Sequence, residues 1–591
     1  MKQPTRLFDF PYHQLHTHPL EKMMSSRLAG EWHSVSTKEF IEKMNLVSRG
    51  LMAMGIQKGD AISLITENNR LEWNILDHGI LQIGAVDVPV YPTMTEQDYE
   101  YIMNHAEVKL CFVSSKELYD KLNRVKAQIP TLQKIYTFER VEGLPHWTDI
   151  FNEADKVDQQ QVDAASATVK ADDLASLIYT SGTTGLPKGV MLSHNNIVSN
   201  VLASTPRLPL FKTGEARTLS FLPCCHIFER MLQYLYIYHS VSMYLTGLDN
   251  VKDDLLVARP TMFTGVPRLF EKFYDGIRAN GLSNQGFKKK IFIWAHDLAC
   301  QWEPEGKNGW WYEFKLKIAS LLVFSKIRKA LGLTEVKAVA CGSAALQPKL
   351  ARFFTGCGIP ILEGYGLTET SPVVSVNTLR TPGMWRWGTT GFPLDNVQVK
   401  IAPDGEILCK GPNVMMGYYK APELTAEVIK DGWFHTGDIG EIRDGFLIIT
   451  DRKKELFKTS GGKYVAPQIV ENAMKESVYI EQLIVIGDGE RFPGALIIPD
   501  FVMLKKWCDE NGVDSSSPEA MIASEKVFAL IQGEVERINK RFGNWEQVKA
   551  FRLLPRLFSI EAGEITPKLS LKRRKIVQNW KALVDEIYGR Q

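Results

Sequence analysis

Apolar and polar positions alternate between two periods in the first part of the chain. Short apolar runs at 61–65, 86–91 and 110–113 fit buried strands, and longer patterns at 37–54 and 95–105 fit helices. Helices that alternate with strands indicate α/β layers. From Trp387 onward the pattern changes to short strands separated by Gly, Pro and Asp turns, which predicts a β-rich subdomain.

The segment after Asp451 has a mixed pattern of its own. Helical patterns cover 468–476 and 524–542, and strand patterns cover 482–486 and 495–499. We therefore predict an α/β protein of two domains: residues 1–450 form a large N-terminal lobe of α/β layers with the β-rich subdomain, and residues 451–591 form a small, mobile α+β domain. The polar stretch 156–170 is interpreted as a surface linker that leads into a strand at 174–179.

Composition narrows the class of protein. The 591 residues carry 70 basic and 68 acidic side chains, so a net charge of +2 gives no overall attraction for nucleic acid. Eight cysteines without a CxxC pair favour reduced thiols over a disulfide framework or a zinc site. The N-terminus lacks a secretory pattern, and the most apolar stretch, 231–245, is too short and interrupted to span a bilayer. We expect that stretch to be buried and the protein to be cytoplasmic.

A loop rich in hydroxyls and glycines follows the strand at 174–179. Its backbone and hydroxyl groups can donate hydrogen bonds to phosphate, and its lysine adds positive charge. The alternative is a flexible surface turn, and the spacing is not that of a Walker loop. The candidate phosphate-binding residues are Thr180, Ser181, Gly182, Thr183, Thr184, Gly185 and Lys188.

This loop, with the residues around it (YTSGTTGLPKGVMLSH), resembles the signature of the adenylate-forming superfamily, which includes acyl-CoA synthetases, firefly luciferase and peptide-synthetase adenylation domains. Residues 363–370 (EGYGLTET) resemble its adenine and magnesium motif. The resemblance implies that Tyr365 stacks on the adenine of ATP and that Thr368 contacts the α-phosphate. It also implies that Glu369 and Thr180 share Mg²⁺, a suitable cation for a carboxylate and phosphates.

Other segments match the superfamily in the same order. Gly342 and Ser343 resemble the small residues beside the adenine and acyl pocket, although a tight turn would use the same residues. Asp438, in WFHTGD, and Arg452 resemble the residues that hold the ribose hydroxyls. The remaining candidates of the adenine motif are Glu363, Gly364 and Gly366.

Four segments resemble long-chain acyl-CoA synthetases in particular: 222–230, 263–272, 323–332 and 431–472. The resemblance implies that a long-chain fatty acid is activated with ATP to an acyl adenylate and pyrophosphate, and is then transferred to coenzyme A. His226 either flanks the fatty-acid carboxylate or is a satisfied core histidine. Glu229 and Arg230 are interpreted as an ion pair that supports this segment.

The resemblance also implies that the C-terminal domain rotates about a hinge near Lys454 and brings a loop containing Gly461, Gly462 and Lys463 toward CoA. In this superfamily a C-terminal lysine contacts the reacting carboxylate. Ser570 occupies its position here, and Lys568 and Lys572 lie two residues away on either side. We favour Lys568 as the catalytic lysine, because Lys572 adjoins a basic run.

Other functions remain open at this stage. An adenylation module, a luciferase or an acyl-AMP ligase would pass the acyl group elsewhere, and a lipid-binding relative would be non-catalytic. The basic and aromatic segment that includes 288–290, Trp294, Trp302, Trp310, Trp311 and 314–331 suits peripheral contact with the inner face of a membrane. The alternative is an amphipathic helix packed on its own core. Oligomeric state is also open, with a homodimer among the hypotheses.

Overall fold

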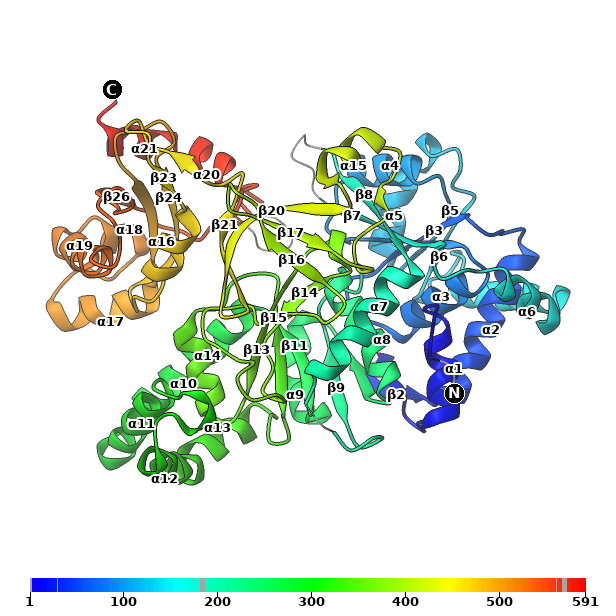
Figure 1. Cartoon of the computed structure of the whole chain (residues 1–591), viewed down its shortest axis with the longest axis horizontal. Coiled ribbons are helices and arrows are strands. Elements are labelled where there is room, and N and C mark those ends of the chain that lie inside the picture. Colours follow the sequence, from blue (N-terminus) through cyan, green and yellow to red (C-terminus); the bar gives the residue numbers. More distant parts are fainter. Residues whose placement is uncertain are drawn as a thin grey trace. The chain divides into compact units, whose positions relative to one another are not determined.

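The apolar runs of the first part of the chain form the central strands of one large sheet (Figure 1). The computed structural model describes residues 3–28, 30–180, 186–209, 211–559, 561–565 and 571–590. β3 (Ala61–Ile65) and β4 (Val86–Val90) are buried at every position, as expected for parallel strands covered on both faces. The order of this seven-stranded sheet is β18 (Gly417–Tyr418), β8 (Lys188–Ser193), β7 (Leu174–Thr180), β4 (Val86–Val90), β3 (Ala61–Ile65), β5 (Val108–Val113) and β6 (Lys134–Thr137).

Two further sheets belong to the same part of the chain. A five-stranded sheet runs β11 (Met262–Gly265), β12 (Ala338–Cys341), β13 (Ile361–Gly366), β14 (Val373–Val376) and β15 (Phe392–Pro393). A four-stranded sheet runs β2 (Glu31–Val35), β1 (Met24–Leu28), β10 (Ser242–Leu245) and β9 (Arg217–Ser220). β11, β12 and β13 are parallel, so their carboxyl ends lie along one edge.

Helices pack on these sheets, which confirms the predicted α/β class. The patterns at 37–54 and 95–105 are the helices α2 and α4, and each begins with a capping box, at Ser36 and Thr95. The helices are α1 (Asp9–Thr17), α2 (Thr37–Ala53), α3 (Leu71–Gln82), α4 (Glu96–His105), α5 (Lys116–Val125), α6 (Gln159–Ala167), α7 (His194–Ser204), α8 (Ile227–Tyr238), α9 (Val251–Ala258), α10 (Pro267–Ser283), α11 (Gly286–Ala299), α12 (Trp310–Ala319), α13 (Ser325–Ala330), α14 (Pro348–Gly356) and α15 (Pro422–Val428).

One prediction in this region was wrong. The stretch 156–170 is not a linker, because most of it forms α6. Asp158 accepts a hydrogen bond from the backbone N–H of Gln161, whose side chain bonds back to the backbone of Asp158. This capping box starts a helix of good helix formers, whose Val162 is buried, so polar composition alone was misleading.

The chain divides into two compact units. Unit 1 consists of 1–400, 408–436 and 443–447, and unit 2 consists of 401–407, 437–442 and 448–591. The boundary therefore runs through the predicted β-rich region, whose strands are β16 (Gln398–Ile401), β17 (Glu406–Lys410), β19 (Ile429–Lys430), β20 (Trp433–Arg443) and β21 (Phe446–Arg452).

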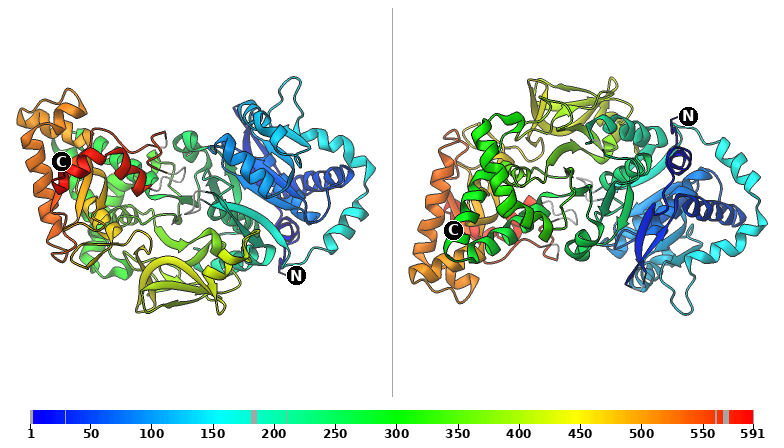
Figure 2. Two further views of the ribbon diagram at one scale, coloured as in Figure 1. Left: turned by 90° about the horizontal axis from the view of Figure 1, so that it is seen from above. Right: turned by 90° about the horizontal axis from the view of Figure 1, so that it is seen from below.

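Unit 2 is built on a three-stranded sheet with a core on each face. Its last helices are orange to red in Figure 2. Alternate residues of the sheet enter different cores: Leu483 and Val485 belong to one, and Ile484 and Ile486 to the other. The strands are β24 (Ile480–Ile486), β25 (Gly494–Pro499) and β26 (Ala550–Leu553), beside a small hairpin of β22 (Phe457–Lys458) and β23 (Tyr464–Val465). The helices are α16 (Pro467–Met474), α17 (Phe501–Asn511), α18 (Pro518–Ile522), α19 (Glu525–Asn539), α20 (Arg573–Asn579) and α21 (Lys581–Tyr588).

The most apolar stretch of the sequence is buried as predicted. Residues 231–245 include most of α8 and all of β10, and α8 is buried at nearly every position. Within the described part of the chain, no helix combines the length and the apolar character that are needed to cross a bilayer.

Candidate functional site

The candidate phosphate loop connects two antiparallel strands of unit 1. Thr180 ends β7, Lys188 begins β8, and the two residues face each other across the strand pair. Their hydroxyl and ammonium groups are therefore fixed at the two ends of the loop. Ser181, Gly182, Thr183, Thr184 and Gly185 lie outside the described residues.

A third strand brings a tyrosine to this pair. β18 lies beside β8, with Tyr418 opposite Val190, and the backbone N–H of Tyr419 donates to the carbonyl of Gly189. The Nζ of Lys188 lies 5.1 Å from the centre of the Tyr418 ring. A lysine held over an aromatic face keeps its charge near the strand ends rather than in bulk solvent.

Tyr418 also connects the loop strands to Glu369. Its Oη donates a hydrogen bond of 3.0 Å to Oε1 of Glu369, which lies in the short 3₁₀ helix η7 (Thr368–Thr370). Burial, and then the nearby Glu369 charge, raise the pKa of Tyr418, so the phenol stays protonated and continues to donate. Glu369 and Lys188 are therefore both held against one side chain.

Hydrogen bonds to backbone carbonyls of η7 fix it against the segment that contains Tyr418. The N–H of Met415 donates to the carbonyl of Glu369 at 2.9 Å, and Nδ2 of Asn413 donates to the carbonyl of Thr370 at 3.0 Å. Thr368 is buried at the start of η7. These bonds position Glu369 through its own backbone as well as through its carboxylate.

The donor set near Glu369 suits a hard cation. Oε1 is occupied by Tyr418, and Oε2 accepts no hydrogen bond from the described residues. Oε2 of Glu369, linked through Tyr418 to the strand that follows the phosphate loop, is a suitable ligand for Mg²⁺, which binds proteins through few oxygen ligands and keeps contacts with phosphates.

The candidates for the adenine pocket gather at the carboxyl ends of β12 and β13. Cys341 is in register with Glu363 on the neighbouring parallel strand, so Gly342 and Ser343 follow beside the start of 363–366. Ligands of open α/β sheets bind at such carboxyl ends. Ser343 has a positive φ of 70°, an uncommon conformation for a side-chain-bearing residue that is found at functional turns.

Close contacts constrain two glycines in this group, and Gly366 much more than Gly342. A Cβ on Gly366 would lie 1.8 Å from the carbonyl oxygen of Pro372, and one on Gly342 would lie 3.2 Å from the Phe228 ring. Gly364 and Tyr365 pair with β14, opposite Val376 and Ser375. The glycines therefore allow β13 and the start of α8 to approach the pocket residues closely.

Glu363 carries an unusual carboxyl group. Burial raises its pKa to about 8, although a hydrogen bond from the backbone N–H of Leu346 acts in the opposite direction. The uncharged acid is thus favoured near neutral pH, and it can act as a hydrogen-bond donor beside the candidate adenine site.

His226 caps α8. Its Nδ1 accepts a hydrogen bond of 3.1 Å from the backbone N–H of Phe228, and Phe228 in turn lies against Gly342. Phe228, two residues after His226, is therefore the residue that lies against a pocket candidate, and the imidazole of His226 has a structural role as helix cap.

Glu229 and Arg230 are not an ion pair with each other. Oε1 of Glu229 accepts a hydrogen bond of 2.5 Å from Ser220, whereas Nη2 of Arg230 lies 2.5 Å from Asp77 and 3.0 Å from Asp87. Successive helix positions point in different directions, so neighbours in sequence meet different partners. Arg230 also donates to Ser176 of β7 at 2.6 Å, which ties α8 to the strand that ends at Thr180.

The two ribose candidates lie together in unit 2. Nε of Arg452 is 3.5 Å from Oδ1 of Asp438, which is buried, while the arginine side chain is largely exposed. The neighbouring Lys453 pairs with Asp404 and Glu406 at 2.6 and 2.9 Å. An aspartate fixed in this way can accept hydrogen bonds from two adjacent hydroxyls.

Gly461, Gly462 and Lys463 form the turn of the hairpin between β22 and β23. The N–H of Gly462 donates to Thr459, and Thr459 donates to the carbonyl of Lys463. Lys463 lies with its Nζ 5.6 Å from the ring of Trp545. Lys568 and Ser570 lie outside the described residues, and Lys572 caps α20, with its N–H donating to the carbonyl of Glu564.

Sequence reasoning missed Tyr418. The residue contacts both Lys188 and Glu369, yet it belongs to a short segment without a motif, and its role depends on pairing between β18 and β8. The available signal in the sequence was the pair Tyr418 and Tyr419 after Gly417, because aromatic residues after a loop indicate a strand.

Comparisons with known proteins identify the family of the chain. The family model described as AMP-binding enzyme matches residues 12–419, and that of the AMP-binding enzyme C-terminal domain matches 455–591. Long-chain-fatty-acid–CoA ligase FadD15 of Mycobacterium tuberculosis is 34% identical over 95% of this chain and 93% of its own. Human long-chain-fatty-acid–CoA ligase 1 is 32% identical, over 95% and 82%.

A solved structure supports the fold. The A domain of carboxylic acid reductase from Segniliparus rugosus, determined in complex with AMP and a carboxylic acid, superposes with a TM-score of 0.73 at 20% identity. The match covers 100% of this chain and 95% of that one. With the family models and the relatives, it confirms the predicted large N-terminal and small C-terminal domains. The chain belongs to the AMP-binding enzyme family.

Proposed function

We propose that this chain is a long-chain-fatty-acid–CoA ligase. The carboxylate of the fatty acid attacks the α-phosphorus of ATP and displaces pyrophosphate, which gives an acyl adenylate. The thiol of CoA then attacks the acyl carbon and displaces AMP, which gives the thioester. The names of relatives at 34% and 32% identity over most of the chain support this substrate class.

The observation that carries the proposal is the cluster around Tyr418 in unit 1. Lys188, Glu369 and Tyr418 come from three segments and are joined by a hydrogen bond and a ring contact. In the proposed first half-reaction, Lys188 and the loop 181–185 bind the phosphates, and Thr180 and Glu369 hold Mg²⁺. When bound, Mg²⁺ supplies positive charge against the phosphate oxygens.

The nucleoside of ATP has its own proposed residues. Tyr365 stacks on adenine within a pocket formed with Gly342, Ser343, Glu363, Gly364 and Gly366. Thr368 contacts the α-phosphate, and His226 flanks the reacting carboxylate. Asp438 and Arg452 bind the ribose hydroxyls, supported by their separation of 3.5 Å and the burial of Asp438. Catalysis on this proposal is mainly positioning with charge stabilisation.

The C-terminal residues are proposed to serve the two half-reactions separately. Lys568 contacts the carboxylate and α-phosphate during adenylation, whereas Gly461, Gly462 and Lys463 serve the transfer to CoA. An exposed hairpin turn with two glycines and a lysine supports a role against a phosphate-bearing ligand. We propose that this division follows a domain boundary between residues 450 and 451.

Product analysis tests the proposal. The purified protein is incubated with palmitate, ATP, MgCl₂ and CoA, and palmitoyl-CoA, AMP and pyrophosphate are measured by mass spectrometry and a coupled assay. We expect equal amounts of the three products, and pyrophosphate exchange without CoA. Exchange without any palmitoyl-CoA would indicate another acyl acceptor, and no exchange with palmitate would refute the ligase assignment.

A further inference from the structure

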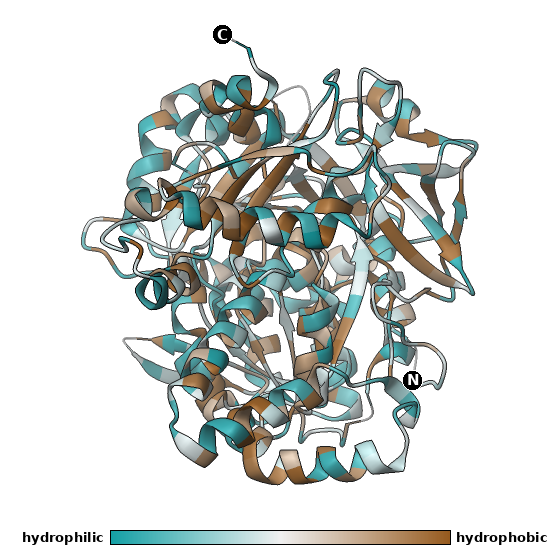
Figure 3. Cartoon of the chain, turned by 90° about the vertical axis from the view of Figure 1, so that its left-hand side faces the viewer, coloured by the Kyte–Doolittle hydropathy of each residue, from teal (hydrophilic) through white to brown (hydrophobic). Residues whose placement is uncertain are grey.

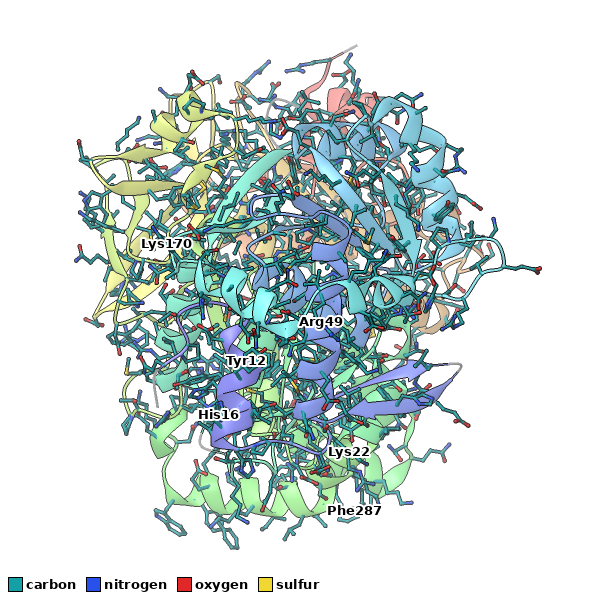
Figure 4. The ribbon with its side chains drawn as sticks, turned by 90° about the vertical axis from the view of Figure 1, so that its right-hand side faces the viewer. Tyr12, His16, Lys22, Arg49, Lys170 and Phe287 are labelled. Carbon is teal, nitrogen blue, oxygen red and sulfur yellow. The ribbon has the colours of Figure 1, made fainter. Side chains whose placement is uncertain are left out.

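Six large apolar side chains on α11, α12 and the segment before α13 are exposed to solvent. Their exposed fractions lie between 45% and 78%. We call them the aromatic face: Phe287, Trp310, Trp311, Phe314, Leu321 and Leu322. The helices that carry them lie at the lower edge of unit 1 in Figure 1, and Figure 4 places Phe287 at the same edge. Such a concentration of exposed apolar groups marks an interaction surface.

The aromatic face is the outer side of a helix whose inner side is also apolar. Tyr312, Ala319 and Phe324 are buried in the core that α12 shares with the five-stranded sheet. On the outer side, Trp310, Phe314, Lys317 and Leu321 recur at helical spacing and are all exposed. Packing on the protein's own core explains only the inner side. An exposed apolar stripe beside lysines, on a helix whose other side is already packed, is typical of a helix that lies at a membrane interface.

A π-helical turn shapes the end of this face. Residues Ser320–Phe324 form the turn, with Ala319 and Phe324 buried on its inner side. Leu321 and Leu322 lie in this turn and are both exposed. Figure 3 shows the resulting hydrophobic positions along the lower helices. Single π-helical turns are frequent at functional sites.

Positive charge surrounds the aromatic face. The helices α11 to α13 contain eight lysines and arginines against two carboxylates, Asp297 and Glu313, in a chain whose net charge is +2. None of the seven lysines forms an ion pair with a carboxylate of the described residues. They are Lys288, Lys289, Lys290, Lys315, Lys317, Lys326 and Lys329. This charge is therefore available to an external anion.

We propose that the aromatic face binds the surface of an anionic lipid bilayer. The tryptophans, Phe287, Phe314 and the leucines enter the boundary between headgroups and acyl chains, and the lysines contact lipid phosphates. Trp302 takes no part, because it packs on Trp385 and Trp387 with ring centres 5.1 and 5.9 Å away. The proposal goes beyond the ligase reaction and does not depend on it.

Vesicle co-sedimentation tests the apolar part of the proposal. The full chain should bind vesicles of phosphatidylcholine with phosphatidylglycerol, bind phosphatidylcholine alone more weakly, and dissociate as salt is raised. The double variant Trp310→Ser, Leu321→Ser should bind the vesicles at least about tenfold more weakly than the wild type, since binding follows buried apolar area. Val502→Ser in unit 2 is the matched control, because Val502 is as exposed as Trp310, at 78%, and should bind like the wild type.

The charge is tested by a second matched pair. Lys288→Gln with Lys290→Gln should weaken binding to the anionic vesicles about 30-fold, from about 1 kcal/mol for each lysine near the surface. Lys505→Gln with Lys506→Gln, on α17 of unit 2, should change it little. Circular dichroism and pyrophosphate exchange with palmitate in detergent verify that all variants are folded.

Three results would overturn the proposal. The first is that the wild type does not bind anionic vesicles at low salt. The second is that Trp310→Ser, Leu321→Ser and Lys288→Gln, Lys290→Gln both bind these vesicles as tightly as the wild type. The third is a dimer in sedimentation velocity without lipid that Trp310→Ser, Leu321→Ser dissociates, since the face would then join two copies of the chain.

Discussion

The two units hold candidates for different parts of the reaction. In unit 1, Lys188 and Glu369 both contact Tyr418 beside the phosphate loop, so this cluster suits phosphate and metal. In unit 2, Asp438 faces Arg452, and a glycine turn precedes Tyr464, which suits a sugar and a second substrate. Substitutions in the unit 1 cluster should therefore impair adenylation alone, whereas those in unit 2 should divide between ATP binding, adenylation and thioester formation.

The largest effect is expected for Glu369→Ala. Loss of the carboxylate proposed to hold Mg²⁺ should lower palmitate-dependent pyrophosphate exchange by about 10³-fold, because charge on the phosphates is no longer compensated. Glu441→Ala, on β20 and exposed, is a control for loss of one carboxylate. Exchange within a few-fold of the wild type would remove Glu369 from the account.

Lys568→Ala should follow, with adenylation slowed about 100-fold, because a positive charge on the reacting carboxylate and α-phosphate is lost. The reaction of preformed palmitoyl adenylate with CoA should be unchanged. Lys572→Ala is the matched control, two residues from Ser570 on the other side. If Lys572→Ala shows the selective defect instead, the assignment moves to that lysine.

Asp438→Ala should raise the KM for ATP about 10- to 100-fold with a smaller change in kcat, because two hydrogen bonds to a charged acceptor are lost. Asp404→Ala removes a more exposed carboxylate of unit 2, which pairs with Lys453, and should leave the KM near that of the wild type. A fall in kcat at constant KM would argue against ribose binding.

Tyr418→Phe isolates the contact that joins the unit 1 cluster. The ring beneath Lys188 is kept and only the hydrogen bond to Glu369 is lost, so exchange should fall about tenfold. The change should appear mostly in the Mg²⁺ concentration needed for half-maximal activity. An unchanged Mg²⁺ dependence would show that Tyr418 has no influence on the metal ligand.

The smallest effect concerns stability and pH. Burial raises the pKa of Glu229 to about 7 in the folded protein, above its value of about 4.5 in the unfolded chain. Its favourable contribution to the free energy of unfolding is therefore complete below about pH 4.5 and is lost as the pH rises to 7. Urea unfolding from about pH 5 to pH 8 should therefore show Glu229→Gln gaining up to about 3 kcal/mol relative to the wild type. A constant difference would mean that Glu229 does not titrate in this range.

Local patterns were sufficient for much of the fold. β3 (61–65) was predicted to the residue, and α16, α19, β24 and β25 within three residues at each end, because each has a strong period or a clear boundary. The helix α6 was missed because the capping box at Asp158 outweighs its polar composition. A local sequence pattern reflects interactions between residues a few positions apart, and these helices and strands are determined mainly by such interactions.

The candidate site was less accessible to sequence reasoning. The hydroxyl and glycine loop was recognised by its chemistry, but the hydrogen bond of Tyr418 to Glu369 depends on the pairing of β18 with β8. The partners of Arg230 were also missed, because Asp77 and Asp87 come from a distant helix and strand. Contacts between segments that are far apart in the chain cannot be read from local periods.

The central claim is that the unit 1 cluster serves adenylation and not thioester formation. It is tested most directly by giving Glu369→Ala and the wild type preformed palmitoyl adenylate with CoA, and measuring the rate of palmitoyl-CoA formation in a single turnover. The account predicts equal rates for this step, despite the loss of pyrophosphate exchange in the variant. A rate that falls as far as the exchange activity would contradict the account.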